Sequence, residues 1–194
     1  MGKKKVRNSL IISLIFLLFG CEESYIPKPL TYYRIDLPTH DYKKYESDCP
    51  FIMHYQKGAV VLPGKGDKKC WLNLIYPKFN ATLHLSYKEA SDAANVQQFK
   101  EESRSLVYKH TVKASGIREY TFENDSNNVD AIIYELSGEA ASPVQFNITD
   151  NKQHFFRGAL YFNHAPNEDS LAPVITFIKE DIKYLVEHFE WKEN

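Results

Sequence analysis

The side chains that most often perform chemistry are scattered in this sequence. Seven histidines stand at positions 40, 54, 84, 110, 154, 164 and 188. Histidine serves as a general acid, a general base or a metal ligand, but metal-binding motifs place their ligands only a few residues apart, and these are not so spaced. The sequence also contains no nucleophile elbow, no His-Glu-x-x-His pair, no dinucleotide-binding glycine pattern and no Walker loop. It therefore predicts no catalytic residue, no metal site and no bound cofactor, although folding can bring distant groups together.

The glycine- and lysine-rich segment 64–69 superficially suggests a phosphate-binding loop. It lacks the Gly-Lys-Ser/Thr ending of such loops and lies between two predicted strands instead of before a helix. We therefore expect a hairpin connection here.

The N-terminus has the layout of an export signal. Four basic residues within the first seven positions precede the apolar run Leu10–Phe19. Ten helical residues at about 1.5 Å each cover half of a hydrocarbon core of about 30 Å, so we interpret the run as a signal peptide rather than a membrane span. The sequence Leu18-Phe19-Gly20-Cys21 then resembles the bacterial lipobox. We expect cleavage before Cys21 and a covalent lipid on it, diacylglyceryl and N-acyl; the alternative is an ordinary signal peptide that contains a cysteine.

The expected processing divides the chain into three parts. Residues 1–20 are the signal peptide, residues 21–31 are the lipidated N-terminus and a stalk, and residues 32–194 are a single folded domain. Pro27 and Pro29 favour an extended stalk. Several acyl chains give stable membrane attachment, which predicts a protein of the cell envelope, with the choice of membrane and of its face left open.

Composition and charge exclude further classes. The chain carries 24 Lys and Arg against 25 Asp and Glu, and cleavage before Cys21 removes four of the basic residues and none of the acidic ones, which leaves a net charge near −5. A nucleic-acid-binding domain is usually basic, so nucleic acid is not expected as a partner. With 43% hydrophobic residues, the chain is too apolar to be disordered.

Cys49 and Cys70 remain as an even pair in an oxidising compartment, which suggests one disulfide. If the strands that follow these cysteines lay in one sheet with a single strand between them, their starts would be about 10 Å apart, beyond the limit of about 7 Å between Cα atoms for a bridge. Two reduced structural thiols and, more remotely, a redox pair are the alternatives.

Alternation and turn residues predict eight strands. They cover residues 51–55, 59–62, 71–76, 81–87, 117–122, 129–136, 144–149 and 154–162, with a turn at 149–152 between the last two. The strand 81–87 is the clearest, with Leu83, Leu85 and Tyr87 on one face and polar residues on the other.

Two helices complete the expected fold. The first starts after the caps Ser91 or Asp92 and runs to about residue 110, with an apolar stripe of Val96, Phe99, Leu106 and Val107. The second carries the stripe Val174, Ile178, Ile182, Leu185 and Phe189, with Pro173 in its first turn. We expect an α+β domain, a mostly antiparallel sheet covered by two amphipathic helices, and this order of elements is similar to the Mog1/PsbP-like α/β/α sandwich.

The polar face of strand 81–87 supports a different function. Thr82, His84 and Ser86 share this face and could line a groove, with His154 and Arg157 nearby. The alternative function is therefore a periplasmic or surface lipoprotein that binds a ligand, or hydrolyses one, on this face.

Long ordered stretches of the sequence resemble one family, the gliding motility-associated lipoprotein family GldD of Bacteroidetes. Beside the lipobox, the resemblance is carried in the first half by the segments Pro27–Pro29, Tyr33–Pro38, Tyr42–Tyr45, Asp48–Phe51 and Cys70–Pro77. It continues in Ala140–Ser142, Gln145–Phe146, Thr149–Asp150, Phe155–Phe162, Pro166–Asn167, Asp169–Ser170 and Leu185–Lys192.

The resemblance implies a non-enzymatic accessory or assembly component of the gliding machinery and the linked type IX secretion system. It implies no catalytic residue, and it supports Cys21 as the lipidation site and Cys49 with Cys70 as a candidate bridge. The implied protein partners are a GldE-type membrane protein and other gliding lipoproteins.

An aromatic and basic segment next to the stalk is the candidate partner-binding surface. It consists of Tyr32, Tyr33, Arg34, Tyr42 and Tyr45. Tyrosine and arginine dominate binding hot spots, which favours docking. The alternative is that these aromatic side chains hold the N-terminal segment against the sheet.

Overall fold

The computed structural model describes residues 35–66, 68–109, 113–163 and 168–192. The predicted lipidation site at Cys21, three of the predicted partner-binding residues (Tyr32, Tyr33 and Arg34), His110 and His164 lie outside the described residues.

Ten strands and two long helices make up the described part of the chain. The strands are β1 (Tyr42–Tyr45), β2 (Phe51–Gln56), β3 (Val60–Pro63), β4 (Leu72–Tyr76), β5 (Ala81–Glu89), β6 (Ala114–Asn124), β7 (Val129–Gly138), β8 (Val144–Thr149), β9 (His154–Phe162) and β10 (Glu190–Trp191). The helices are α2 (Ala93–Lys109) and α3 (Glu168–Glu187), and two short 3₁₀ turns cover Pro77–Phe79 and Asp125–Asn127. The α+β class with a mostly antiparallel arrangement and two helices is confirmed.

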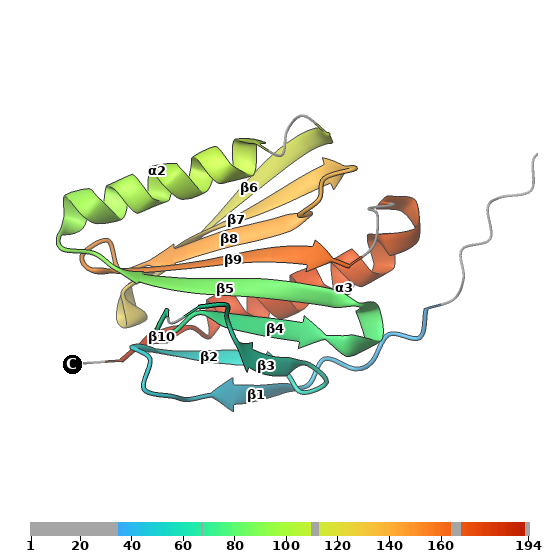
Figure 1. Ribbon diagram of the computed structural model, residues 1–194, viewed down its shortest axis with the longest axis horizontal. Coiled ribbons are helices and arrows are strands. Elements are labelled where there is room, and N and C mark those ends of the chain that lie inside the picture. The colour runs from blue at the N-terminus through green and yellow to red at the C-terminus, as the bar shows by residue number, and fades with distance from the viewer. Residues whose placement is uncertain (1–34, 67, 110–112, 164–167, 193–194) are drawn as a thin grey trace, which may run out of the picture. The chain divides into compact units, whose positions relative to one another are not determined.

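The strands form two sheets instead of the one expected. The large sheet has seven antiparallel strands in the order β3-β4-β5-β9-β8-β7-β6, and the small sheet has the order β1-β2-β10 (Figure 1). Strands β3 and β4, which flank the segment 64–69, pair antiparallel, in agreement with the predicted hairpin. The expectation of one sheet was wrong because β2 pairs with β1 and β10, two strands that the sequence analysis did not predict.

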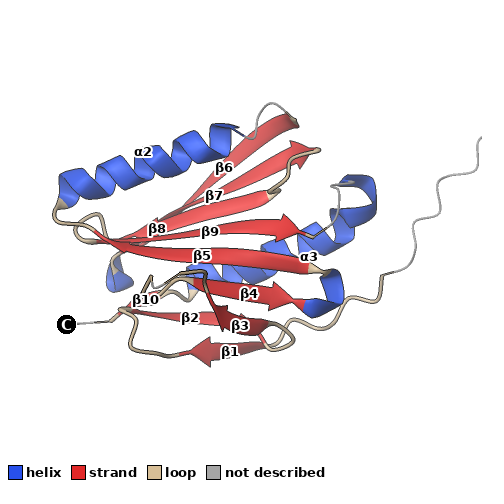
Figure 2. Cartoon of the chain, in the orientation of Figure 1, coloured by secondary structure: helices blue, strands red, loops and turns tan. Residues whose placement is uncertain are grey.

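The main core lies between one face of the large sheet, α3 and the small sheet. Helix α3 passes behind the strands in the view of Figure 1, and Figure 2 shows both helices in blue against the red strands. The largest fully buried side chains come from all three layers; they include Phe51 and Met53 of β2, Leu83 of β5, Phe146 of β8, Phe156 and Leu160 of β9, and Ile178 and Ile182 of α3. The alternation predicted for residues 81–87 places Leu83 and Leu85 in this core, as expected.

Helix α2 covers part of the opposite face of the large sheet. Asp92 caps it, since its carboxylate accepts a hydrogen bond from the backbone N–H of Asn95 at 2.8 Å. The predicted apolar stripe was wrong at Leu106, which is 42% exposed, whereas Ser103 is buried. A helical residue lies about 100° from its neighbour, so burial of Val107 turns Leu106 toward solvent.

The predicted stripe of α3 is confirmed, since Val174, Ile178, Ile182 and Leu185 are all buried. The placement of Pro173 in the first turn was wrong because the helix already begins at Glu168, which puts Pro173 inside it.

Candidate functional site

Cys49 and Cys70 are joined by a disulfide in the structure, with their Cα atoms 5.6 Å apart. The distance objection raised by the sequence does not apply, because Cys49 precedes β2 of the small sheet and Cys70 precedes β4 of the large one. The bridge therefore ties the two sheets together. Cys70 has a φ of 66°, a left-handed conformation that is unfavourable for a residue with a side chain.

Two of the predicted partner-binding residues are occupied in contacts within the fold. The ring of Tyr42 stacks on Tyr184 of α3 with 3.6 Å between centroids. Tyr45 meets Tyr55 of the neighbouring strand edge-on at 6.4 Å and packs against the main core. These contacts favour the interpretation that Tyr42 and Tyr45 hold the N-terminal segment on the domain.

A buried carboxylate on α3 anchors the same segment. Asp181 is 2% exposed, and its Oδ1 lies 2.7 Å from Nδ1 of His40 and accepts a hydrogen bond from the Tyr42 hydroxyl at 3.1 Å. The His40 ring stacks on Phe177 at 4.3 Å. Burial raises the pKa of Asp181 above its usual value, and the hydrogen bond from His40 and its charge oppose that rise. Burial, followed by the nearby Asp181 charge, raises the pKa of the Tyr42 hydroxyl.

The sequence analysis missed this network because its members are far apart in the chain. One signal was available: Asp181 directly precedes Ile182 and lies three residues after Ile178, so an acidic residue falls within the buried stripe of α3. A buried carboxylate in such a stripe requires hydrogen-bond donors from another segment.

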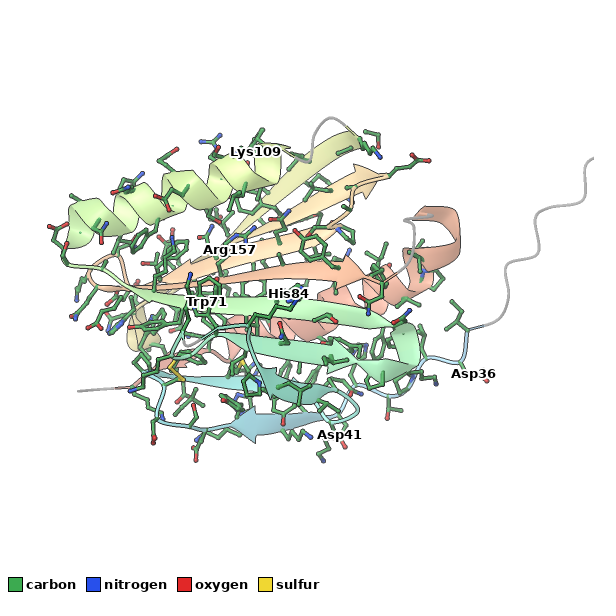
Figure 3. All side chains as sticks on the ribbon, in the orientation of Figure 1. Asp36, Asp41, Trp71, His84, Lys109 and Arg157 are labelled. Atoms are coloured by element: carbon green, nitrogen blue, oxygen red, sulfur yellow. A yellow bond between two sulfur atoms is a disulfide. The ribbon has the colours of Figure 1, made fainter. Side chains whose placement is uncertain are left out.

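The polar face of β5 lies on the side of the large sheet opposite to the main core. His84 is exposed, and its Nδ1 lies 2.6 Å from Oδ1 of Asn73 on β4, whereas Thr82 is buried and Ser86 half-buried. The register pairs Ser86 with Arg157 of β9, and Arg157 in turn with Asn147 of β8 (Figure 3 labels His84 and Arg157). The structure thus brings Arg157 into the predicted polar face. The expectation for His154 was wrong, because residues 154 and 157 lie on opposite faces of β9 and His154 contacts the Tyr87 hydroxyl.

Arg157 lies in an environment that is rich in hydrogen-bond donors. It donates to Oε1 of Gln145 at 2.6 Å, and within the described ranges it forms no ion pair with a carboxylate. Gln145 and Asn147 are each 1% exposed. Nε2 of Gln145, Nε of Arg157 and both Nδ2 and Oδ1 of Asn147 have no hydrogen-bond partner among the described residues. Burial lowers the pKa of Arg157 from its usual value.

A cavity of about 270 Å³ lies on the other face, between α3, the β7–β8 connection and the end of β9. Its walls are mostly apolar and include Ala140, Val144, Phe162, Leu171 and Ile175.

The same cavity has a charged end at Glu135 of β7, which is 7% exposed. Oε1 of Glu135 lies 3.3 Å from Nζ of Lys179, Oε2 lies 3.3 Å from the Arg118 guanidinium, and Tyr120 donates its hydroxyl proton to Oε2 at 3.4 Å. No sequence motif marks this site. The available signals were an acidic residue in the otherwise apolar run 131–136 of β7 and a lysine four residues after Ile175.

Two searches of the described ranges give negative results. No group of three or more His, Cys, Asp or Glu side chains there is placed to hold a metal ion. No helix in the same ranges combines the length and the hydropathy that a membrane crossing requires.

Comparisons with known proteins place the chain in a sequence family. The family model described as "Gliding motility lipoprotein GldD" matches residues 22–191. No curated protein matches the chain significantly. Among solved structures, the chain is similar to the solution structure of cyanobacterial PsbP (CyanoP) from Synechocystis sp. PCC 6803, with 8% identity, a TM-score of 0.47 and coverage of 84% of this chain and 99% of that one. A match at this level carries no argument about function.

Proposed function

Since the chain belongs to the GldD family of gliding motility lipoproteins, we propose that it is a non-enzymatic accessory component that assembles or stabilises the gliding machinery and the linked type IX secretion system. The family is one of lipoproteins, so the protein is a membrane-anchored component of the cell envelope. The proposal concerns its role there and its partners.

The extent of the family match carries this proposal. The match spans residues 22–191 and so includes every described strand and helix. A match of this extent relates the whole fold to the family, whereas a short motif would relate one site.

The contacts of the described histidines link each ring to the fold. One ring nitrogen of each described histidine lies within hydrogen-bond distance of another group: His40 with Asp181, His54 with the carbonyl of His188, His84 with Asn73, His154 with the Tyr87 hydroxyl, and His188 with the carbonyl of Tyr184. These partners are structural groups of the fold. No sequence motif for a nucleophile accompanies any of these histidines.

The proposed mode of action is docking close to the membrane. A lipid on Cys21 would keep the domain at the membrane surface, and the segment Tyr32–Arg34 would contact a GldE-type membrane protein or another gliding lipoprotein. Tyr42 and Tyr45 would act indirectly, because their contacts with Tyr184 and Tyr55 hold the chain that leads to this segment.

Crosslinking in intact cell envelopes tests this function. The full-length lipidated protein is crosslinked in its native envelope, purified by affinity and analysed by mass spectrometry. We expect recovery of gliding or secretion components, and lower recovery with Tyr33→Ala combined with Arg34→Ala. Tyr108→Ala, at an exposed tyrosine on α2, is the matched control and should leave recovery unchanged. Recovery of the folded protein alone would contradict the proposal.

One observation favours the alternative function, ligand binding at the polar sheet face. Arg157, Gln145 and Asn147 bring a cation, three unpaired N–H donors and one unpaired acceptor, Oδ1 of Asn147, together on this face, and the excess of donors suits a small anion. Phosphate and acetate are suitable probes for the full-length protein, and Arg157→Met should then abolish their binding.

A further inference from the structure

The apolar cavity beside α3 has two chemically different ends. Leu171 and Ile175 of α3 line one end together with Val144 and Phe162 of the sheet, and this end is apolar. Thr176 and Lys179 line the cavity together with Glu135 and give it a polar end. We propose that this cavity binds a small molecule that carries one carboxylate and a short apolar chain.

The charges at the polar end favour an anion. Glu135 contributes one negative charge, while Lys179 and Arg118 contribute two positive charges within 3.3 Å of its oxygens. Two cations therefore share one carboxylate at this end, of which Oε1 makes no hydrogen bond with a described residue, and the excess of positive charge favours an anionic group over a cationic one. A cationic ligand would meet two like charges in the same place.

Lys179 is the residue best placed to contact the ligand. Its ammonium has three N–H donors, and the Glu135 carboxylate is its ion-pair partner among the described side chains. Its side chain is 21% exposed, compared with 68% for Arg118, so Lys179 lies deeper and its interaction is less screened by water. Thr176, one turn earlier on α3, adds a hydroxyl to the same wall.

The volume limits the size of the ligand. A cavity of about 270 Å³ is just below the range of about 300–1,000 Å³ for pockets that hold drug-sized ligands, so it fits a molecule of a few carbon atoms beyond the carboxylate. The apolar part of the wall favours contact with an apolar chain, since such contact removes apolar surface from water. The apolar end therefore takes the chain, and the polar end takes the carboxylate.

A head-group series tests the proposal directly. Hexanoate, hexanol and hexylamine share one chain length and differ only in charge. Each is titrated into the full-length protein in nanodiscs, with Ile175 and Leu171 methyl signals followed by NMR. We expect hexanoate to bind at least about tenfold more tightly than hexanol, because hydrogen bonds to charged groups are stronger than neutral ones. Hexylamine should bind most weakly.

Variants identify the residue that causes the preference for hexanoate. Lys179→Gln should remove the preference for hexanoate over hexanol, whereas Lys179→Arg should keep it. Lys183→Gln is the control on the same helix, because Lys183 pairs with Glu180 and does not line the cavity. Ala172→Trp should fill the cavity and abolish binding of all three compounds, with the unchanged methyl spectrum of the remaining core as the check on folding.

Three results would overturn the proposal. They are equal affinity for hexanol and hexanoate in the native protein, tighter binding of hexylamine than of hexanoate, and undiminished hexanoate binding by folded Ala172→Trp. Absence of methyl shifts with all three compounds would also overturn it. None of these results bears on the proposed gliding role, which the crosslinking experiment tests separately.

Discussion

Removal of the bridge between Cys49 and Cys70 should cost the protein a large part of its stability. The cysteines are 21 positions apart, so the disulfide closes a loop of 22 residues in the unfolded chain. In the chain-entropy model, a loop of this length corresponds to about 3 kcal/mol at 25 °C. Globular domains are stable by only about 5–15 kcal/mol in total, so the loss is easily measured.

A second variant separates the covalent bond from the backbone strain at Cys70. Replacing both cysteines by alanine removes the bond and keeps a side chain at φ 66°. Combining Cys49→Ala with Cys70→Gly also removes the bond but relieves the left-handed conformation, which costs a residue with a Cβ about 1 kcal/mol or more. The glycine variant should therefore be about 1 kcal/mol more stable than the double alanine variant.

Guanidinium unfolding at 25 °C measures both differences. Tryptophan fluorescence is a suitable signal, because Trp71 is next to Cys70 and Trp191 packs against His154. Free energies come from linear extrapolation with equal slopes. A loss below about 1 kcal/mol for the double alanine variant would refute the loop-entropy argument. Equal stability of the alanine and glycine variants would refute the argument about strain.

Two further predictions concern the core and the buried carboxylate. Gly158→Ala should destabilise the protein by about 1–3 kcal/mol in thermal or chemical unfolding, because an added Cβ would lie 2.2 Å from the Phe146 ring, whereas Gly116→Ala, with no atom within 4 Å, should change stability by less than about 0.5 kcal/mol. Equal effects of the two substitutions would contradict this packing argument. Burial raises the pKa of Asp181, so the folded protein keeps this proton to a higher pH than the unfolded chain; stability relative to Asp181→Asn should therefore fall as pH rises from about 4 through the raised value. Urea unfolding of both proteins across this window checks the sign. If the native protein instead gains stability relative to Asp181→Asn as pH rises, the contact with His40 outweighs burial.

Regular patterning made much of the large sheet predictable. Strands β8 and β9 have the predicted bounds, 144–149 and 154–162, since turn residues separate two runs of strand-forming ones. Asp150 fixes that turn, because its carboxylate accepts hydrogen bonds from the backbone N–H groups of Lys152, Gln153 and His154.

The small sheet could not be predicted in the same way. Strand β10 has only two residues, Glu190 and Trp191, and therefore no periodicity. Strand β1 contains Lys43 and Lys44 between two tyrosines and has no strand-like alternation of apolar residues. Both strands exist because they pair with β2, and the sequence does not encode such long-range pairing in a local pattern.

The candidate sites also differ in how far the sequence alone could predict them. The cysteines could be singled out because their number and the compartment restrict what they can do. The cavity and the environment of Asp181 depend on which segments α3 lies against, and only the tertiary structure shows this. Unusual polar residues within apolar runs, such as Glu135 and Asp181, were the only local indications.

The position of the disulfide also determines how the domain would respond to mechanical tension. A pull from the N-terminal side would first load the segment from residue 35 to Cys49, which β1 and the His40 and Tyr42 contacts hold in place. At Cys49 the tension would pass through the sulfur atoms to Cys70 and into the hydrogen-bonded β4 of the large sheet. Strands β2 and β3 lie within the closed loop, so the covalent bond shields them from extension. If a lipid on Cys21 anchors the chain to a membrane as we propose, tension on the domain would peel the outer segment away while the large sheet bears the load.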